Sequence, residues 1–390
     1  MEFVGGNRLT LLCNGEQYFP ALVAAIDAAH EEVFIETYIF ADDETGSLVA
    51  DALARAAVRG VAVYLLLDGF GARDFAPRFR DMLQDAGAGV LVFRPEISPW
   101  RLRRGRLRRM HRKLACIDGR VGFVGGINVI DDYDTPGQTP PRYDYAVRIE
   151  GPLTADLRAA TARQWSQVSW ATLGRRWPGL RRPAPGDGAP DPASVQGGQR
   201  AALVVRDSLR HRHDIEDAYL EQIEGARSEV VIASAYFLPG RRFRRALAEA
   251  TARGVKVVLL LQGRVEYTLL HYASRALYGT LLAAGIEIHE YHRSFLHAKV
   301  AVFDCCIASV GSSNIDPFSL MLAREANVFV DDAAFANELR ASLAEAQRVG
   351  ARAVPPQQWK RQPLWRRVRV WIAYGIARLL ISVASYEHYH

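Results

Sequence analysis

The chain has 390 residues, of which 49% are hydrophobic and 24% charged, a composition that excludes a disordered or collagen-like chain. Lys and Arg together number 49 and Asp and Glu 43, and the net charge of +6 favours an anionic partner such as nucleic acid, an anionic membrane surface or a phosphorylated substrate. The four cysteines imply no disulfide framework, and the N-terminus lacks the pattern of a signal peptide.

The first part of the chain alternates strand and helix patterns. Runs rich in β-branched and aromatic residues predict strands at 32–40, 61–67, 90–93, 113–117, 121–124 and 144–149. Helical periodicity and stop signals predict helices at 46–57, 79–86 and 153–169. This alternation is typical of an α/β protein whose sheet is covered by helices.

Residues 174–199 are dense in Pro and Gly and have no apolar period, so they are predicted to form a linker or an exposed loop. After this segment the order of elements repeats: 229–237 resembles 32–40, and 253–261 resembles 59–67.

We therefore expect two similar α/β/α sandwich halves with mixed, largely parallel sheets, related by a pseudo-two-fold axis. The predicted boundaries are a first half at 1–173, the linker at 174–199, a second half at 200–354 and an amphipathic C-terminal segment at 355–390.

A pattern of His, Lys, Asp and Asn occurs once in each half with the same internal spacing. In both copies the Asp follows the His by seven positions and the Asn follows it by seventeen. The copies are His111, Lys113, Asp118 and Asn128, and His297, Lys299, Asp304 and Asn314. Two of the only four lysines in the chain stand at equivalent positions, where a compact ammonium suits one oxygen of a phosphate. The alternative interpretation is a pair of ordinary strands whose lysines extend to solvent.

The spacing also predicts how these side chains meet. Residues two apart on a strand share a face, so the His and Lys of each copy point the same way, and the Gly-containing turn returns the Asn to the start of the motif. If the halves pack face to face, two imidazoles suit a two-step displacement at phosphorus, one as nucleophile and one as acid and base. The lysines and amides would stabilise the developing charge, so no metal or other cofactor is expected.

On these residues the chain resembles the phospholipase D superfamily, whose signature is a doubled His-x-Lys-x4-Asp motif, over roughly residues 30–335. Within it the chain is most similar to bacterial cardiolipin synthases. That resemblance rests on HRKLACIDGRVGFVGGIN, on GSSNIDPFSL followed by MLAREAN, on RIEGP at 148–152 and on AYFLPG at 235–240.

The resemblance implies a covalent phosphohistidine at His111, with His297 as the acid and base. It implies that both lysines and both asparagines hold the phosphate, and that Asp118 and Asp304 complete the catalytic motifs by fixing them from outside the pocket. A carboxylate is expected to orient each imidazole. By position we assign Asp144 to His111 and Glu325 to His297.

Two enzymatic functions fit the motifs. The first is a phosphatidyltransferase that makes cardiolipin from phosphatidylglycerol; the second is a hydrolase of the same mechanism, acting on a phospholipid in preference to nucleic acid. A binding protein with an inactive site is the third interpretation, although no motif residue is missing. Many cardiolipin synthases begin with two transmembrane helices, and none is expected here, so the resemblance implies a shorter, peripheral type.

Two segments are expected to contact a membrane. Trp100, Arg103, Arg104 and Arg108 belong to a basic run with interleaved apolar residues, for which a solvated loop is the alternative. Residues 365–383 are amphipathic on a helix and carry Trp365 and Trp371; the alternative is a helix packed on the core. We therefore expect a protein active as a monomer at the cytoplasmic face of the membrane, with no obligatory nucleic acid.

Overall fold

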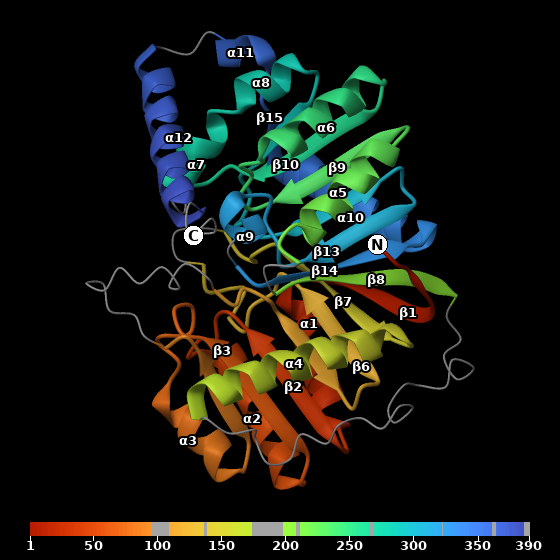
Figure 1. Cartoon of the computed structure of the whole chain (residues 1–390), viewed down its shortest axis with the longest axis vertical. Helices are drawn as coiled ribbons and strands as arrows, with labels where there is room; N and C mark the ends of the chain where they lie inside the picture. The colour runs from red at the N-terminus through yellow and green to blue at the C-terminus, as the bar shows by residue number, and fades with distance from the viewer. Residues whose placement is uncertain are drawn as a thin grey trace.

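The computed structural model describes residues 1–95, 109–135, 139–173, 198–207, 211–265, 268–321, 323–360 and 364–385. Two α/β halves lie one above the other along the longest axis, with the N-terminus at their junction (Figure 1). The predicted linker falls outside the described residues from 174 to 197, and its last residue, Gln199, already begins a strand.

The first half contains seven strands and four helices in its described part. They are β1 (Val4–Cys13), α1 (Asn14–Asp27), β2 (Glu32–Thr37), α2 (Glu44–Val58), β3 (Ala62–Asp68), α3 (Pro77–Asp85), β4 (Gly89–Phe93), β5 (Leu114–Ile117), β6 (Val121–Gly125), β7 (Tyr145–Glu150) and α4 (Leu153–Leu173). The elements predicted from 32 onward are confirmed within a few residues, except that the first strand ends at Thr37; β1 and α1 were not predicted.

The second half repeats this order and adds helices. Its elements are β8 (Gln199–Arg206), α5 (Asp214–Gly225), β9 (Glu229–Ser234), α6 (Arg241–Ala252), β10 (Lys256–Gln262), α7 (Thr268–Arg275), α8 (Tyr278–Ala283), β11 (Glu287–Tyr291), β12 (Lys299–Phe303), β13 (Ile307–Gly311), α9 (Pro317–Met321), β14 (Glu325–Asp331), α10 (Ala333–Gly350), β15 (Ala351–Ala353), α11 (Pro356–Lys360) and α12 (Leu364–Ser385).

The strands of both halves hydrogen-bond into one sheet with the order β15-β11-β10-β9-β12-β13-β14-β8-β1-β7-β6-β5-β2-β3-β4. Counted outward from the antiparallel β1–β8 pair, the two sides have the same order, as a pseudo-two-fold axis requires. The sheet is mixed, as expected, but the expectation of largely parallel strands was wrong. Among the described strands, parallel pairing is confined to β2–β3, β3–β4, β9–β10 and β10–β11. The motif strands form β5–β6 and β12–β13 hairpins, and a short turn can connect only antiparallel neighbours.

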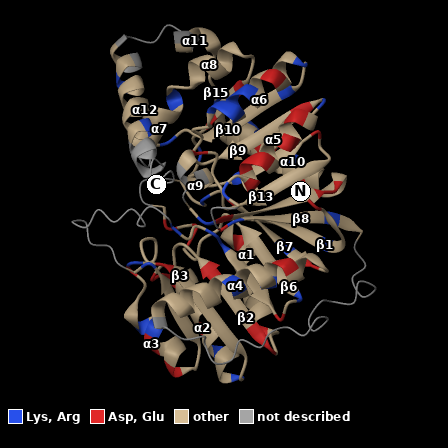
Figure 2. Ribbon diagram, in the orientation of Figure 1, with Lys and Arg blue, Asp and Glu red and all other residues tan. Residues whose placement is uncertain are grey.

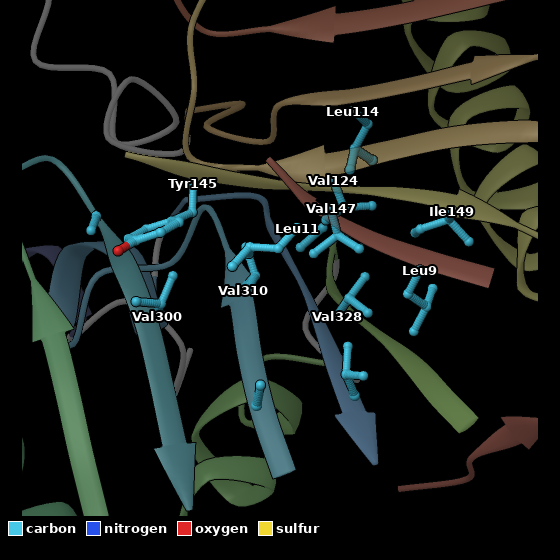
Figure 3. Packing of buried hydrophobic residues seen from close by; sticks show 14 of the residues in the cluster. Leu9, Leu11, Leu114, Val124, Tyr145, Val147, Ile149, Val300, Val310 and Val328 are labelled. Carbon is cyan, nitrogen blue, oxygen red and sulfur yellow. The ribbon is translucent and has the colours of Figure 1, made fainter. Parts of the chain in front are cut away.

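The core lies where the two sides of the sheet fold against each other. Leu11, Val124 and Val147 from the first half meet Val310 and Val328 from the second in one buried cluster (Figure 3). Helices α4 and α10 extend this cluster, while α1–α3 and α5–α8 cover the opposite faces. Full burial of a Val or Leu side chain stabilises a fold by about 1.5–3 kcal/mol, so this interface holds the halves in one fixed arrangement.

Asp118 and Asp304 stand in the hairpin turns with left-handed backbone angles, φ 53° and 51°, which Asp tolerates better than most residues. Asp118 accepts hydrogen bonds from the backbone N–H groups of His30, Glu31 and Glu32 at 2.8–2.9 Å. Asp304 accepts the equivalent three from residues 227–229. Both carboxylates therefore fasten a motif hairpin to the start of the neighbouring strand, outside the pocket.

The helix α12 runs beside α7 and also contacts α9 (Figure 1). Val370, Ala373 and Ala377 are buried against the second half. The opposite face is exposed and apolar, and comprises Trp365, Val368, Trp371, Ile372, Ile376 and Leu379. Among the residues that the structure describes, no helix has both the length and the apolar character needed to cross a bilayer.

We expect Asp118→Ala to lower the free energy of unfolding by about 2–4 kcal/mol, because it leaves three backbone donors without their charged acceptor. Asp331→Ala is the matched control: it removes a carboxylate from an exposed ion pair with Arg200, worth about 0–1 kcal/mol. Urea denaturation of both variants measures the difference. Equal losses would contradict the structural role of Asp118.

Candidate active site

Each motif histidine is held by the backbone of the opposite half. The N–H of His111 donates to the carbonyl of Arg324 at 2.9 Å, and the N–H of His297 donates to the carbonyl of Tyr143 at 2.8 Å. Short parallel bridges, Met110 to Arg324 and Tyr143 to Leu296, continue these contacts. Two motifs 186 positions apart in the chain therefore meet at one junction, as their repetition predicts.

The carboxylates that orient the imidazoles are exchanged between the halves. His111 Nδ1 lies 3.0 Å from Glu325 Oε1, and His297 Nδ1 lies 2.6 Å from Asp144 Oδ2. Each acid lies on Nδ1 of a motif histidine, but the predicted pairing was wrong, because each acid contacts the histidine of the other half. The backbone of His111 bonds to Arg324, and the next residue in that segment is Glu325. The backbone of His297 bonds to Tyr143, and the next residue in that segment is Asp144. A carboxylate on Nδ1 fixes the tautomer and leaves Nε2 to face a substrate.

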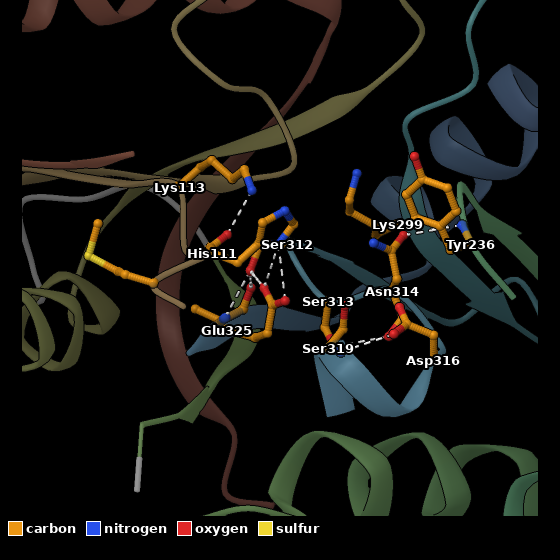
Figure 4. A network of polar contacts seen from close by, with 12 residues as sticks. His111, Lys113, Tyr236, Lys299, Ser312, Ser313, Asn314, Asp316, Ser319 and Glu325 are labelled. Carbon is orange, nitrogen blue, oxygen red and sulfur yellow. Dashed lines mark hydrogen bonds and ion pairs between the residues drawn. The ribbon is translucent and has the colours of Figure 1, made fainter. Parts of the chain in front are cut away.

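The lysines occupy equivalent positions, as the spacing predicted. Lys113 Nζ donates to the carbonyl of His111 at 2.7 Å (Figure 4). Lys299 Nζ donates to the carbonyl of His297 in the same way. Lys299 also lies 3.8 Å from Asp144 and is fully buried. Arg112 points to the other side of the strand and forms a buried ion pair with Glu36 at 2.7 Å. The alternation expected for a strand thus separates the site lysine from the structural arginine.

The asparagines use their side-chain oxygens to hold the loops that follow β2 and β9. Asn128 accepts from the N–H of Ile39 at 3.2 Å, and Asn314 accepts from the N–H of Tyr236 at 3.4 Å. Because the oxygen is engaged, the amide NH2 is the group that each Asn can offer to a phosphate. Figure 4 shows Asn314 beside Lys299.

Burial controls the charge of this site. It lowers the pKa of His111 and, more strongly, that of His297, and the nearby lysines act in the same direction. Burial also lowers the pKa of Lys113 to about 7 and raises that of Asp144 to about 6. Too little negative charge surrounds the buried lysines and the histidines to stabilise their protonated forms, and a bound phosphate would supply it.

Several site residues were not identified from the sequence. Ser312 donates to the carboxylate of Glu325, whereas Gly126 occupies the equivalent place in the first half. There a Cβ would overlap the carboxylate of Asp144. The Tyr38 ring lies 4.8 Å from the imidazole of His111 and 5.4 Å from Lys113 Nζ. The Gly-Gly and Gly-Ser-Ser difference at the turn was the available signal for Ser312.

The predicted residues therefore separate into four groups. Both histidines, lysines and asparagines and the two orienting acids lie at the junction, and Asp118 and Asp304 support it from outside. Trp100, Arg103, Arg104 and Arg108 lie outside the described residues. Trp365 and Trp371 are exposed on α12.

We expect sulfate, whose charge is constant between pH 7 and 9, to bind this site with falling affinity as pH rises. Free Lys113 loses its proton near pH 7, and a bound anion raises its pKa, so binding above pH 7 requires proton uptake. The dissociation constant should increase by up to about tenfold per pH unit. Calorimetric titration measures it.

Lys113→Met should flatten this pH dependence, whereas Lys256→Met, which changes an exposed lysine, should leave it intact. A pH-independent dissociation constant in the unmodified protein would contradict the assignment.

The chain also matches known proteins. The family model described as "Cardiolipin synthase, PLD-like domain" matches residues 22–136 and 219–346. Cardiolipin synthase B of Escherichia coli (strain K12) is 38% identical over 378 residues, which cover 96% of this chain and 88% of that protein. The "Major cardiolipin synthase ClsA" of Bacillus subtilis (strain 168) is 30% identical over 386 residues, covering 98% of this chain and 76% of that protein.

Among solved structures, the phosphatidylserine synthase of Haemophilus influenzae Rd KW20 superposes with a TM-score of 0.67. The alignment covers 95% of this chain and 94% of that one, and at 14% identity it supports the fold alone. The sequence matches extend over nearly the whole chain and include both motifs. The chain therefore belongs to the cardiolipin synthase family with a PLD-like domain, within the phospholipase D superfamily that its doubled motif indicated.

Proposed function

We propose that this protein is a phosphatidyltransferase that makes cardiolipin from two molecules of phosphatidylglycerol. The observation that carries the proposal is the meeting of His111 and His297 at one junction, each oriented by a carboxylate of the opposite half. Such a centre provides a nucleophile and a proton carrier for one phosphorus atom, which is the requirement for two successive displacements.

In the first step, His111 Nε2 attacks the phosphorus of one phosphatidylglycerol and forms the P–N bond. The bond from phosphorus to the glycerol headgroup breaks, and His297 donates a proton to the departing oxygen, so that glycerol is released. Because burial lowers the pKa of His297, its protonated form depends on the negative phosphate nearby.

In the second step, His297 takes the proton from a headgroup hydroxyl of another phosphatidylglycerol. The resulting oxygen attacks phosphorus, the P–N bond breaks, and cardiolipin leaves with both histidines restored. Lys113, Lys299 and the two asparagine amides hold the non-bridging oxygens in both steps, which stabilises the charge that develops on them. Water in place of the second lipid would give phosphatidic acid by hydrolysis.

We further propose that the protein binds peripherally to the cytoplasmic face of the membrane through α12. Its exposed face presents two Trp and four aliphatic side chains, flanked by the exposed Arg369 and Arg378. The helix lies at the edge of the second half in Figure 2. Trp side chains suit the headgroup level, and the aliphatic side chains suit the acyl boundary. A helix placed in this way would keep the site near a substrate that stays in the bilayer. The site is complete within one chain, which supports activity as a monomer.

The chemical proposal is tested with vesicles of phosphatidylglycerol and separation of the lipid products. We expect cardiolipin and free glycerol in the presence of EDTA. His111→Ala should abolish the covalent phosphatidyl-enzyme, and His297→Ala should form it at least about 100-fold more slowly, because general-acid catalysis typically contributes this much.

His30→Ala, which changes an exposed histidine, is the control and should retain full activity. Phosphatidic acid as the main product would favour the hydrolase, and cleaved DNA with unchanged lipid would favour a nuclease. Phosphatidyl label on His297 would reverse the two roles.

The membrane proposal predicts that Trp371→Ser combined with Ile372→Ser weakens binding to anionic vesicles at least tenfold in a flotation assay. Each side chain loses part of the roughly 1.5–3 kcal/mol that full burial of an apolar side chain provides. Val58→Ser, which alters an exposed apolar residue on α2, is the matched control. Unchanged vesicle binding with an intact fold would refute a role for this helix.

A further inference from the structure

A small pocket with both polar and apolar lining lies in the second half at the carboxyl ends of β9 and β10. Its volume is about 20 Å³, which is room for about one hydroxyl-sized group. The polar side chains that line it are Tyr236, Gln262, Arg264, His271, Ser274 and Tyr278.

The pocket contains a buried donor without a hydrogen-bond acceptor. Gln262 is 7% exposed, and its Nε2 makes no hydrogen bond to any part of the chain that the structure describes. Its Oε1 accepts from the N–H of Arg264 at 3.3 Å, which fixes the direction of the amide. An unpaired buried NH2 destabilises the fold, and a hydrogen bond to a ligand oxygen in the pocket would remove that cost.

The first half has no such donor at the equivalent place. Asp68 ends β3 as Gln262 ends β10, and it accepts from the N–H of Met110 and of Phe70, both at 2.8 Å. In the first half, the residue at the strand end therefore accepts a hydrogen bond from the backbone just before His111. The pseudo-two-fold symmetry is therefore broken at the residue that faces the pocket, which points to a ligand bound in the second half only.

The pocket is adjacent to the active site. Tyr236 borders the pocket, and its backbone N–H donates to Asn314, which lies beside Lys299 (Figure 4). On the opposite side, His271 and Ser274 belong to α7, the helix on which α12 packs. Burial lowers the pKa of His271 to about 4, so this wall is uncharged at neutral pH. The pocket thus lies between the proposed membrane helix and the phosphate centre.

We propose that this pocket binds a hydroxyl of the acceptor headgroup, and that Gln262 Nε2 donates a hydrogen bond to that oxygen while the neighbouring hydroxyl attacks phosphorus. The inference rests on the proposed transfer reaction and adds its acceptor specificity: alcohols with two adjacent hydroxyls are preferred over monohydric alcohols and water. Gln262 is then a specificity residue for the alcohol at His297, which is the acceptor in the second step and the departing glycerol in the first.

The test is a competition between propane-1,2-diol and propan-1-ol as acceptors, with phosphatidylglycerol vesicles as donor. The ratio of the two phosphatidyl alcohols gives the preference directly, and the rate of phosphatidyl-enzyme formation reports the first step separately. The unmodified protein should favour the diol. Gln262→Met should lower that preference at least tenfold and still form the phosphatidyl-enzyme, because the motif histidines are unchanged.

Ser274→Ala makes a smaller change on the α7 side of the pocket and should also lower the preference for the diol. This second variant keeps the inference testable if Gln262→Met does not fold. Gln84→Met, the same substitution at an exposed helical position, is the control. If the unmodified protein transfers to alcohols but both pocket variants keep its preference, the inference fails while the proposed function stands. If no phosphatidyl-enzyme and no transfer product form, both fail.

Discussion

The active site depends on the exchange of contacts between the two halves. The β1–β8 pair joins the halves edge to edge, and the buried valines and leucines between them fix their relative position. On this frame, each motif histidine bonds through its backbone to a segment of the other half and through Nδ1 to that segment's carboxylate. Neither half contains a complete oriented histidine, so one half alone does not provide the centre.

The same arrangement determines the electrostatics. Two buried lysines, the buried Asp144 and Glu325 and two half-buried histidines share a space in which charged forms are costly. Burial depresses the pKa of Lys113 and of both histidines and raises that of Asp144. In the proposed reaction an anionic phosphodiester supplies negative charge to the site, which would couple substrate binding to the protonation of the lysines and histidines. Blue and red residues meet accordingly at the junction in Figure 2.

The symmetry of the duplication is incomplete where the two halves have different tasks. Asp144 is accommodated by Gly126, whereas Glu325 receives a hydrogen bond from Ser312. Asp68 holds a backbone N–H, whereas Gln262 leaves a donor facing a pocket. Both halves contribute the same histidine and lysine to the site, but the residues around them differ. In the proposed reaction, this difference would allow the donor lipid and the acceptor lipid to be bound in different ways.

Most of the strands and the motif residues of the site could be predicted from the sequence. Apolar runs such as 61–67 identify buried strands without alignment, and the repeated spacing from His111 and from His297 identifies the motif residues. The strand β1 was missed because polar residues and Gly interrupt its apolar residues. The strand β8 was missed because its apolar run at 201–205 follows directly on the predicted linker. The exchange of Asp144 and Glu325 was missed because it is a tertiary relation across the pseudo-two-fold axis. Local sequence assigns each acid to the histidine of its own half.

The most direct test of the central claim is an experimental structure of the protein with tungstate, a phosphate mimic. The account predicts one tungstate per chain, contacted by Nε2 of both His111 and His297, with Glu325 on Nδ1 of the first and Asp144 on Nδ1 of the second. Two separate ions, one at each histidine, or carboxylates paired within their own halves, would contradict it.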